Sequence, residues 1–168
     1  MTPLSPPLRA GEFVLWRLDQ AIHAPTWDSG EGSYRVGGRW NSRGVRAVYA
    51  ALDPGTAILE VAVNKTFEAL DIVAHVLTRA RILDPAKIHI LTAANIPNPN
   101  WLRPGMPSAG QRAFGDALLR AHPMIFIPSV VSAQSWNVIF DSSTAKNLYD
   151  SVEQEAFALD TRLNPPAA

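Results

Sequence analysis

The chain has 168 residues, of which 47% are hydrophobic and 18% charged, a composition typical of one folded domain. Its 15 Lys and Arg balance 15 Asp and Glu, so no net charge draws it to nucleic acid or to an anionic membrane. Cysteine is absent, which excludes a disulfide scaffold, a zinc–thiolate site and a cysteine nucleophile, and agrees with a cytoplasmic location. No apolar run is long enough to span a membrane, and the N-terminus shows no signal-peptide pattern.

We expect a Pro-rich arm over 1–12, a strand over 13–18, a long loop over 23–38 and a strand over 46–51. Asp53 followed by Pro54 predicts the start of a helix that runs to about residue 70. Ser108 opens a second helix, which runs to about residue 121. Further strands are expected over 71–82, 88–91, 124–127 and 136–140, with a loop over 95–107 and a last helix over 148–159.

Short strands outnumber the helices, which predicts a single α+β domain with a mostly antiparallel sheet. We assign this domain to residues 13–160, followed by a tail over 161–168. The charge is unevenly distributed, because residues 35–46 contain four arginines and no acid, whereas residues 141–160 are acidic. Arginine forks suit phosphate oxygens, although most clusters of charge are simply solvated surface.

The segment Gly37-Gly38-Arg39-Trp40-Asn41 is the sharpest local feature. Two glycines allow the backbone to approach a ligand closely, and an arginine, an aromatic ring and an amide follow at once. A turn that merely contains an arginine is the alternative. The pattern is neither a P-loop nor a Rossmann fingerprint.

Glu60 stands in an apolar helical run, where a carboxylate that becomes buried needs partners. The alternative is that Glu60 has a structural role, in an ion pair with Arg39 or Arg17. Tyr49, on the second strand, and Ser129, which follows a proline, have equally ordinary interpretations as a core side chain and a turn residue. The four histidines show neither a hydrolase pattern nor a metal-ligand spacing, so we expect no metal.

The ordered set of motifs is more specific than its parts. It consists of Trp16-Arg17, Ser29-Gly30-Glu31-Gly32, Gly37 to Asn41 with Gly44, Val48-Tyr49-Ala50-Ala51, Ala57-Ile58-Leu59-Glu60, Ile127-Pro128-Ser129 and Trp136-Asn137-Val138. This set resembles the RES-domain family, which is named for an arginine, a glutamate and a serine. The similarity spans about residues 13–141.

The resemblance implies the toxin of a bacterial type II toxin–antitoxin system, with a fold similar to that of ADP-ribosyltransferases and an Xre-like helix-turn-helix antitoxin as partner. NAD⁺ would be the substrate, and no cofactor is implied. The resemblance assigns catalysis to one group of residues and substrate binding to an overlapping one. The catalytic group is Arg39, Tyr49, Glu60 and Ser129; the binding group is Arg17, Arg39, Trp40, Asn41, Tyr49, Ser129 and Asn137.

Several alternatives stay open at this point. The acceptor of the ADP-ribose could be water, inorganic phosphate or a protein, the last of which would make the chain an ADP-ribosyltransferase. A non-catalytic interaction module and an RNase toxin are further possibilities, the latter disfavoured by the neutral charge and by the lack of a histidine near the arginines. An exposed Trp101 would leave room for a homo-oligomer.

Overall fold

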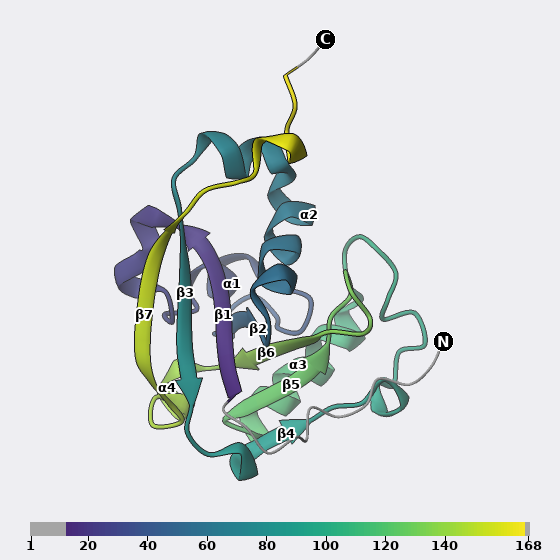
Figure 1. The fold of residues 1–168 in the computed structure, drawn as a ribbon. Helices are drawn as coiled ribbons and strands as arrows, with labels where there is room; N and C mark the ends of the chain where they lie inside the picture. The colour runs from purple at the N-terminus through teal and green to yellow at the C-terminus, as the bar shows by residue number, and fades with distance from the viewer. Residues whose placement is uncertain (1–12, 167–168) are drawn as a thin grey trace.

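The computed structural model describes residues 13–166 (Figure 1), so the expected arm over 1–12 and the last two residues of the tail lie outside the described residues. Seven strands form one sheet in the order β4-β5-β6-β2-β1-β3-β7, and every pair except β4–β5 is antiparallel. This confirms the α+β class and the mostly antiparallel sheet. The strands are β1 (Phe13–Gln20), β2 (Val48–Ala51), β3 (His75–Ile82), β4 (Ile88–Ile90), β5 (Met124–Pro128), β6 (Trp136–Phe140) and β7 (Tyr149–Phe157).

The sheet has two parts that meet at a weak seam. Strands β1 and β2 are paired through one position, Trp16 opposite Ala51, whereas β1 and β3 are paired along eight residues. Figure 1 shows β1, β3 and β7 side by side, with β5 and β6 running across them. The Arg17 guanidinium spans the seam by donating to the Tyr49 carbonyl oxygen at 2.7 Å. The sheet therefore opens between β1 and β2, where side chains from both parts face a common space.

Helix α2 (Pro54–Ile72) covers this opening and begins where the sequence predicts. The Asp53 carboxylate accepts a hydrogen bond from the Thr56 backbone N–H at 2.8 Å, and Pro54 occupies the first turn. Leu18, Ala62, Leu70 and Leu77 pack the helix against β1 and β3. At Thr66 the backbone leaves the helical region, with φ of 70° and ψ of 155°.

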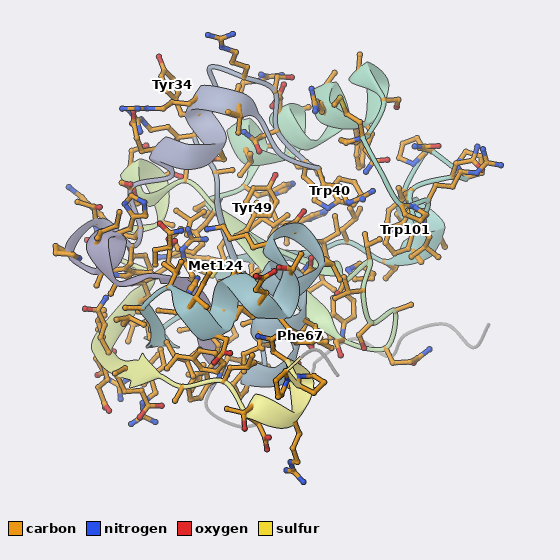
Figure 2. The ribbon with its side chains drawn as sticks, turned by 90° about the horizontal axis from the view of Figure 1, so that it is seen from above. Tyr34, Trp40, Tyr49, Phe67, Trp101 and Met124 are labelled. Atoms are coloured by element: carbon orange, nitrogen blue, oxygen red, sulfur yellow. The ribbon has the colours of Figure 1, made fainter. Side chains whose placement is uncertain are left out.

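Helix α3 (Ala109–Ala121) begins after its predicted cap, since Ser108 Oγ accepts from the Gln111 N–H at 3.2 Å. It packs on the β5 side with a cluster that includes Trp40, Trp101 and Leu119. Figure 2 shows Tyr49, Trp40 and Trp101 following one another across the molecule. Trp101 is only 6% exposed, so the expectation of an exposed ring there is wrong, and the homo-oligomer it suggested loses that support.

Two further expectations are corrected. The segment expected as one loop over 23–38 contains a 3₁₀ helix η1 (Ala21–Thr26) and the helix α1 (Glu31–Val36). The last element is the strand β7 and not a helix, because its acids find partners across β3: Glu153 pairs with Arg79 at 2.6 Å and Asp150 with Arg81 at 2.9 Å. The remaining short helices are η2 (Pro85–Lys87), η3 (Ala93–Asn95), α4 (Ser142–Ala145) and η4 (Thr161–Leu163).

Smaller shifts affect the ends of elements. Strand β3 begins at His75 and not at residue 71, because α2 continues to Ile72 before the chain turns. Over residues 13–166, no helix combines the length and the apolar character that a membrane crossing needs.

Candidate active site

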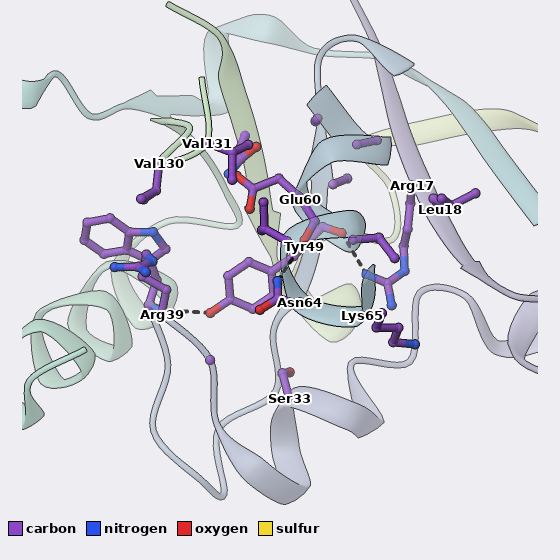
Figure 3. Close-up of a pocket in the computed structure, with 18 of the residues that line it drawn as sticks. Arg17, Leu18, Ser33, Arg39, Tyr49, Glu60, Asn64, Lys65, Val130 and Val131 are labelled. Atoms are coloured by element: carbon purple, nitrogen blue, oxygen red, sulfur yellow. Dashed lines mark hydrogen bonds between the residues drawn. The ribbon is translucent and has the colours of Figure 1, made fainter. Parts of the chain in front are cut away.

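A cavity of about 510 Å³ lies at the seam of the sheet, within the size range of ligand sites. Its walls come from β1, β2, α2, the segment 36–40 and residues around Gly105. Figure 3 shows Glu60 and Tyr49 between Arg39 on one side and Arg17 and Lys65 on the other. The cavity therefore brings together residues that are far apart in the sequence, from Trp16 to Asn137.

The Glu60 carboxylate is held by one of its two oxygens. Oε1 accepts hydrogen bonds from Ser129 Oγ at 2.8 Å and from Asn137 Nδ2 at 2.6 Å. Within the described chain, Oε2 has no hydrogen-bond partner, although the side chain lines the cavity. The alternative of an ion pair with Arg39 or Arg17 is not observed among these residues, since both arginines bind elsewhere. One oxygen thus fixes the carboxylate and leaves the other for a ligand.

Ser129 is completely buried at the end of β5. Its hydroxyl donates to Glu60 and accepts from the backbone N–H groups of Val131 and Ser132, both at 3.2 Å. A hydroxyl has one proton and two lone pairs, so these three bonds use its whole capacity. Ser129 is not among the residues that line the cavity, and its bond positions Glu60; the expected contact of Ser129 with the substrate stays a prediction.

Asn137 belongs to β6 and is 8% exposed. Its amide nitrogen holds Glu60, and its Oδ1 atom is buried with no hydrogen-bond partner in the described structure. The residue lines the cavity, and this oxygen is a buried acceptor without a donor among the described residues. The expected role of Asn137 in substrate binding fits this placement.

Arg17 and Asp19 lie two residues apart on β1 and share one face of the strand. The Arg17 guanidinium binds the Asp19 carboxylate at 2.6 Å as well as the Tyr49 carbonyl. Both residues line the cavity. Asp19 was missed from the sequence because the predicted strand ends at residue 18, whereas β1 continues to Gln20 and brings Asp19 onto the face of Arg17.

Tyr49 and Asn41 hold the glycine-containing loop in place. The Tyr49 hydroxyl donates to Asn41 Oδ1 at 2.6 Å and accepts from the Trp40 N–H at 3.0 Å. Burial of the phenol raises the pKa of Tyr49 well above its ordinary value. At Gly38 a Cβ atom would lie 2.5 Å from the Tyr49 hydroxyl, so the close approach requires glycine.

Asn41 is completely buried, and its amide nitrogen donates to the carbonyl oxygens of Ser33, Ser42 and Val45. It does not line the cavity, in contrast to the substrate contact that the motif suggested. The tryptophan before it, Trp40, is buried against Trp101 with only part of it on the wall. This half of the motif therefore builds the loop.

Arg39 reaches from this loop to the segment around Gly105. Its guanidinium donates to the carbonyl oxygens of Trp101, Arg103 and Gly105 at 3.2, 3.3 and 3.4 Å. These bonds are long and the acceptors are neutral, so the positive charge stays uncompensated by any acid among the described residues. Arg39 thus joins two segments of the wall and contributes charge to the cavity.

The charged residues of the wall are unequal in sign. Four cationic and two acidic side chains line the cavity, so the lining carries an excess of two positive charges. The cationic residues are Arg17, Arg39, Lys65 and Arg112, and the acidic residues are Asp19 and Glu60. Lys65 and Arg112 were missed from the sequence, because they lie on two different helices and follow no local motif. No histidine lies among the described residues that line the cavity.

Three comparisons with known proteins cover most of the chain. The model of the RES domain family matches residues 14–161. Toxin Res of Pseudomonas putida is 29% identical over 155 residues, which are 90% of this chain and 99% of that protein. A chain in the crystal structure of the M. tuberculosis MbcT–MbcA toxin–antitoxin complex superposes with a TM-score of 0.63 at 17% identity, covering 88% of this chain and 85% of that one.

The family model covers most of the chain, so the chain belongs to the RES domain family. It is a homologue of a RES toxin, and it shares its fold with a chain of a toxin–antitoxin complex. On the motifs quoted above, the resemblance assigns the arginine, glutamate and serine for which the family is named to Arg39, Glu60 and Ser129, and this assignment stays a prediction. The structure places Glu60 and Ser129 in hydrogen-bond contact and Arg39 on the wall of the same cavity.

Proposed function

We propose that this RES-domain protein is the toxin of a toxin–antitoxin pair and that it cleaves the nicotinamide–ribose bond of NAD⁺. The observation that carries the proposal is the Glu60 carboxylate, which is fixed through Oε1 and presents Oε2 to a cavity of ligand size. Membership of the family and the toxin homologue support the biological role.

One carboxylate is sufficient for this chemistry. When the bond between ribose C1 and the nicotinamide nitrogen breaks, its electron pair neutralises the positive ring, so the leaving group needs no proton. The ribose becomes oxocarbenium-like, and an adjacent carboxylate stabilises the developing positive charge. Glu60 supplies that charge, while Ser129 and Asn137 hold it in one orientation.

The remaining wall suits the rest of NAD⁺. The Tyr49 ring lies on the wall, and its hydroxyl is already bonded to the protein, so the ring face serves the nicotinamide or its ribose by stacking. Asn137 Oδ1 can accept from the carboxamide nitrogen or from a ribose hydroxyl. The positive excess of the lining complements the pyrophosphate.

The release step decides among the acceptors. Attack of water on the ribosyl cation yields ADP-ribose and a proton, and attack of inorganic phosphate yields ADP-ribose 1″-phosphate. Transfer to a side chain would yield an ADP-ribosylated protein. The RNase alternative is less well supported, because the described lining holds no histidine to act as a general base.

An antitoxin would silence the toxin by covering the cavity. Three strongly exposed apolar side chains stand at or beside its mouth: Val36 at 74%, Val63 at 63% and Met106 at 87%. A helix-turn-helix partner of the Xre type could cover these side chains and place a carboxylate among the arginines. The acids of β7 are poorer candidates for that contact, since Asp150 and Glu153 already pair with arginines of β3. We place the reaction in the cytoplasm, where NAD⁺ is available.

The test is direct. Purified protein is incubated with NAD⁺, with and without inorganic phosphate, and nicotinamide, ADP-ribose and ADP-ribose 1″-phosphate are quantified, with Glu60→Gln as the matched inactive control. Nicotinamide release by the wild type, and expression that stops bacterial growth and lowers NAD⁺, would support the proposal. A folded wild-type protein that releases no nicotinamide would contradict it.

A further inference from the structure

Arg112 differs from the other arginines of the cavity in having no protein partner. It lies on α3, lines the cavity and is half-buried. Its Nε atom is buried without a hydrogen-bond partner. Throughout residues 13–166, neither of its terminal nitrogens makes a hydrogen bond or an ion pair. A guanidinium nitrogen that loses water without gaining a partner is unfavourable, and the terminal nitrogens, which are not among the buried unpartnered atoms, stay open to an anionic ligand.

The other two arginines of the wall have protein partners at their terminal nitrogens. Arg17 binds Asp19 and the Tyr49 carbonyl through these nitrogens, so much of its charge is neutralised, and only its buried Nε lacks a partner in the described structure. Both terminal nitrogens of Arg39 donate hydrogen bonds, to three backbone carbonyl oxygens in all. Arg112 is therefore the arginine of the described wall whose forked donors are all uncommitted.

The backbone that carries Arg112 is fixed against the Arg39 loop. One turn further along α3, a Cβ atom at Gly115 would overlap the Trp40 carbonyl oxygen, so helix and loop are in close contact. The buried Asp116 carboxylate accepts from the Ser42 N–H at 2.8 Å. Residues 112, 115 and 116 share one face of the helix, so this contact directs Arg112 toward the loop. Arg112 and Arg39 line the same cavity, and the helix that carries Arg112 packs directly against the loop that carries Arg39.

We propose that Arg112 binds a phosphoryl group of the substrate's pyrophosphate through its forked N–H donors, with Arg39 contributing mainly charge and loop structure. The proposal rests on the proposed function, since it assigns one part of NAD⁺ to one side chain. It places the pyrophosphate at the α3 side of the cavity and leaves the Glu60 side for the nicotinamide ribose. Guanidinium suits this role because its planar fork matches two phosphate oxygens.

The experiment compares Arg112→Gln and Arg112→Lys with the wild type. Arg120→Gln is the matched control, because Arg120 is an exposed arginine on the same helix outside the cavity lining. KM and kcat for NAD⁺ are measured together with inhibition constants for ADP-ribose, which carries the pyrophosphate, and for nicotinamide, which is neutral. Calorimetric binding of ADP-ribose provides a readout independent of turnover.

For Arg112→Gln we expect KM for NAD⁺, the inhibition constant of ADP-ribose and its calorimetric dissociation constant to rise about 10- to 100-fold. The value of kcat and the inhibition by nicotinamide should stay nearly unchanged. The same constants of Arg112→Lys should lie between those of the wild type and of Arg112→Gln, because lysine keeps the charge and lacks the forked donors. Unchanged ADP-ribose binding in Arg112→Gln, an equal loss for nicotinamide, or the same loss in Arg120→Gln would each overturn the assignment. A wild type that cleaves no NAD⁺ would contradict the proposed function; ADP-ribose calorimetry would still decide the role of Arg112.

Discussion

The two ends of the cavity are built on different principles. At the Glu60 end, Ser129 and Asn137 hold the carboxylate by bonds of 2.8 and 2.6 Å from side chains that are at most 8% exposed. At the other end, Arg39 makes bonds of 3.2 to 3.4 Å to neutral carbonyls, and Arg112 makes none in the described structure. Short bonds to an ionised group are the stronger kind, so the first end is preorganised and the second is incomplete without a ligand.

This difference separates catalysis from binding in the proposed mechanism. A transition state gains most from a charge that is already in place, because no reorganisation is needed when the bond breaks. A pyrophosphate arrives with its own charge and can complete the donors that the protein leaves open. Substitutions at the Glu60 end should therefore lower kcat, and substitutions at the arginine end should raise KM.

The largest effect is expected for Glu60→Gln, which keeps the shape and removes the charge. Loss of one preorganised electrostatic contact costs about 3–4 kcal/mol of barrier, so kcat should fall roughly 10²- to 10³-fold. NAD⁺ affinity should change little. Steady-state nicotinamide release and calorimetry with ADP-ribose measure the two quantities. If Glu60→Gln keeps near-full turnover, Glu60 is a structural residue and the comparison of the two ends fails.

Arg39→Ala should weaken binding and rate together. It removes a positive charge from the wall and also releases the segment around Gly105 from the glycine-containing loop. We expect kcat/KM to fall by roughly 10- to 100-fold, chiefly through KM, because a phosphate-binding charge acts in the ground state and in the transition state. Arg43→Ala, at an exposed arginine of the same loop outside the lining, is the control and should behave as the wild type.

Ser129→Ala should act through Glu60. It removes one of the two donors to Oε1 and leaves the N–H groups of the half-buried Val131 and Ser132 without their acceptor. The expected loss is about 1–3 kcal/mol of unfolding free energy and roughly a tenfold lower kcat at unchanged KM. Urea denaturation and steady-state kinetics measure both. A rise in KM without a change in kcat would instead indicate a direct substrate contact.

The smallest effect is expected away from both ends, at the stacked rings of His89 and His122, whose centroids lie 4.0 Å apart. Burial, with the charge of His122, lowers the pKa of His89 below its ordinary 6.5. As the pH falls through 6.5, the unfolded chain binds this proton before the folded chain does, so stability declines on acidification. His89→Gln should flatten that decline, measured by urea denaturation roughly one unit above and below this value. An unchanged slope would show that His89 does not contribute to it.

Local signals in the sequence were sufficient for much of the fold. A helix cap is a local signal, because its side chain bonds to a backbone N–H group within the first turn of the helix. Asp53 and Ser108 both make such a bond to the residue three positions later, and α2 and α3 begin where these caps predict. The last strand illustrates the limit. Residues 148–159 carry no local feature that excludes a helix, and β7 forms because β3 presents Arg79 and Arg81 to Glu153 and Asp150 more than 60 positions away.

The same division applies to the site. The ordered set of motifs from Trp16-Arg17 to Trp136-Asn137-Val138 was enough to indicate the family and the candidate glutamate. Which of their polar atoms remain available to a ligand was decided by tertiary contacts, because a hydrogen bond satisfied within the protein removes an atom from the site. Packing consumes the Ser129 hydroxyl and the Asn41 amide and leaves Glu60 Oε2 and Asn137 Oδ1 open among the described residues. It also brings Arg112 to the wall, which no local pattern in the sequence could indicate.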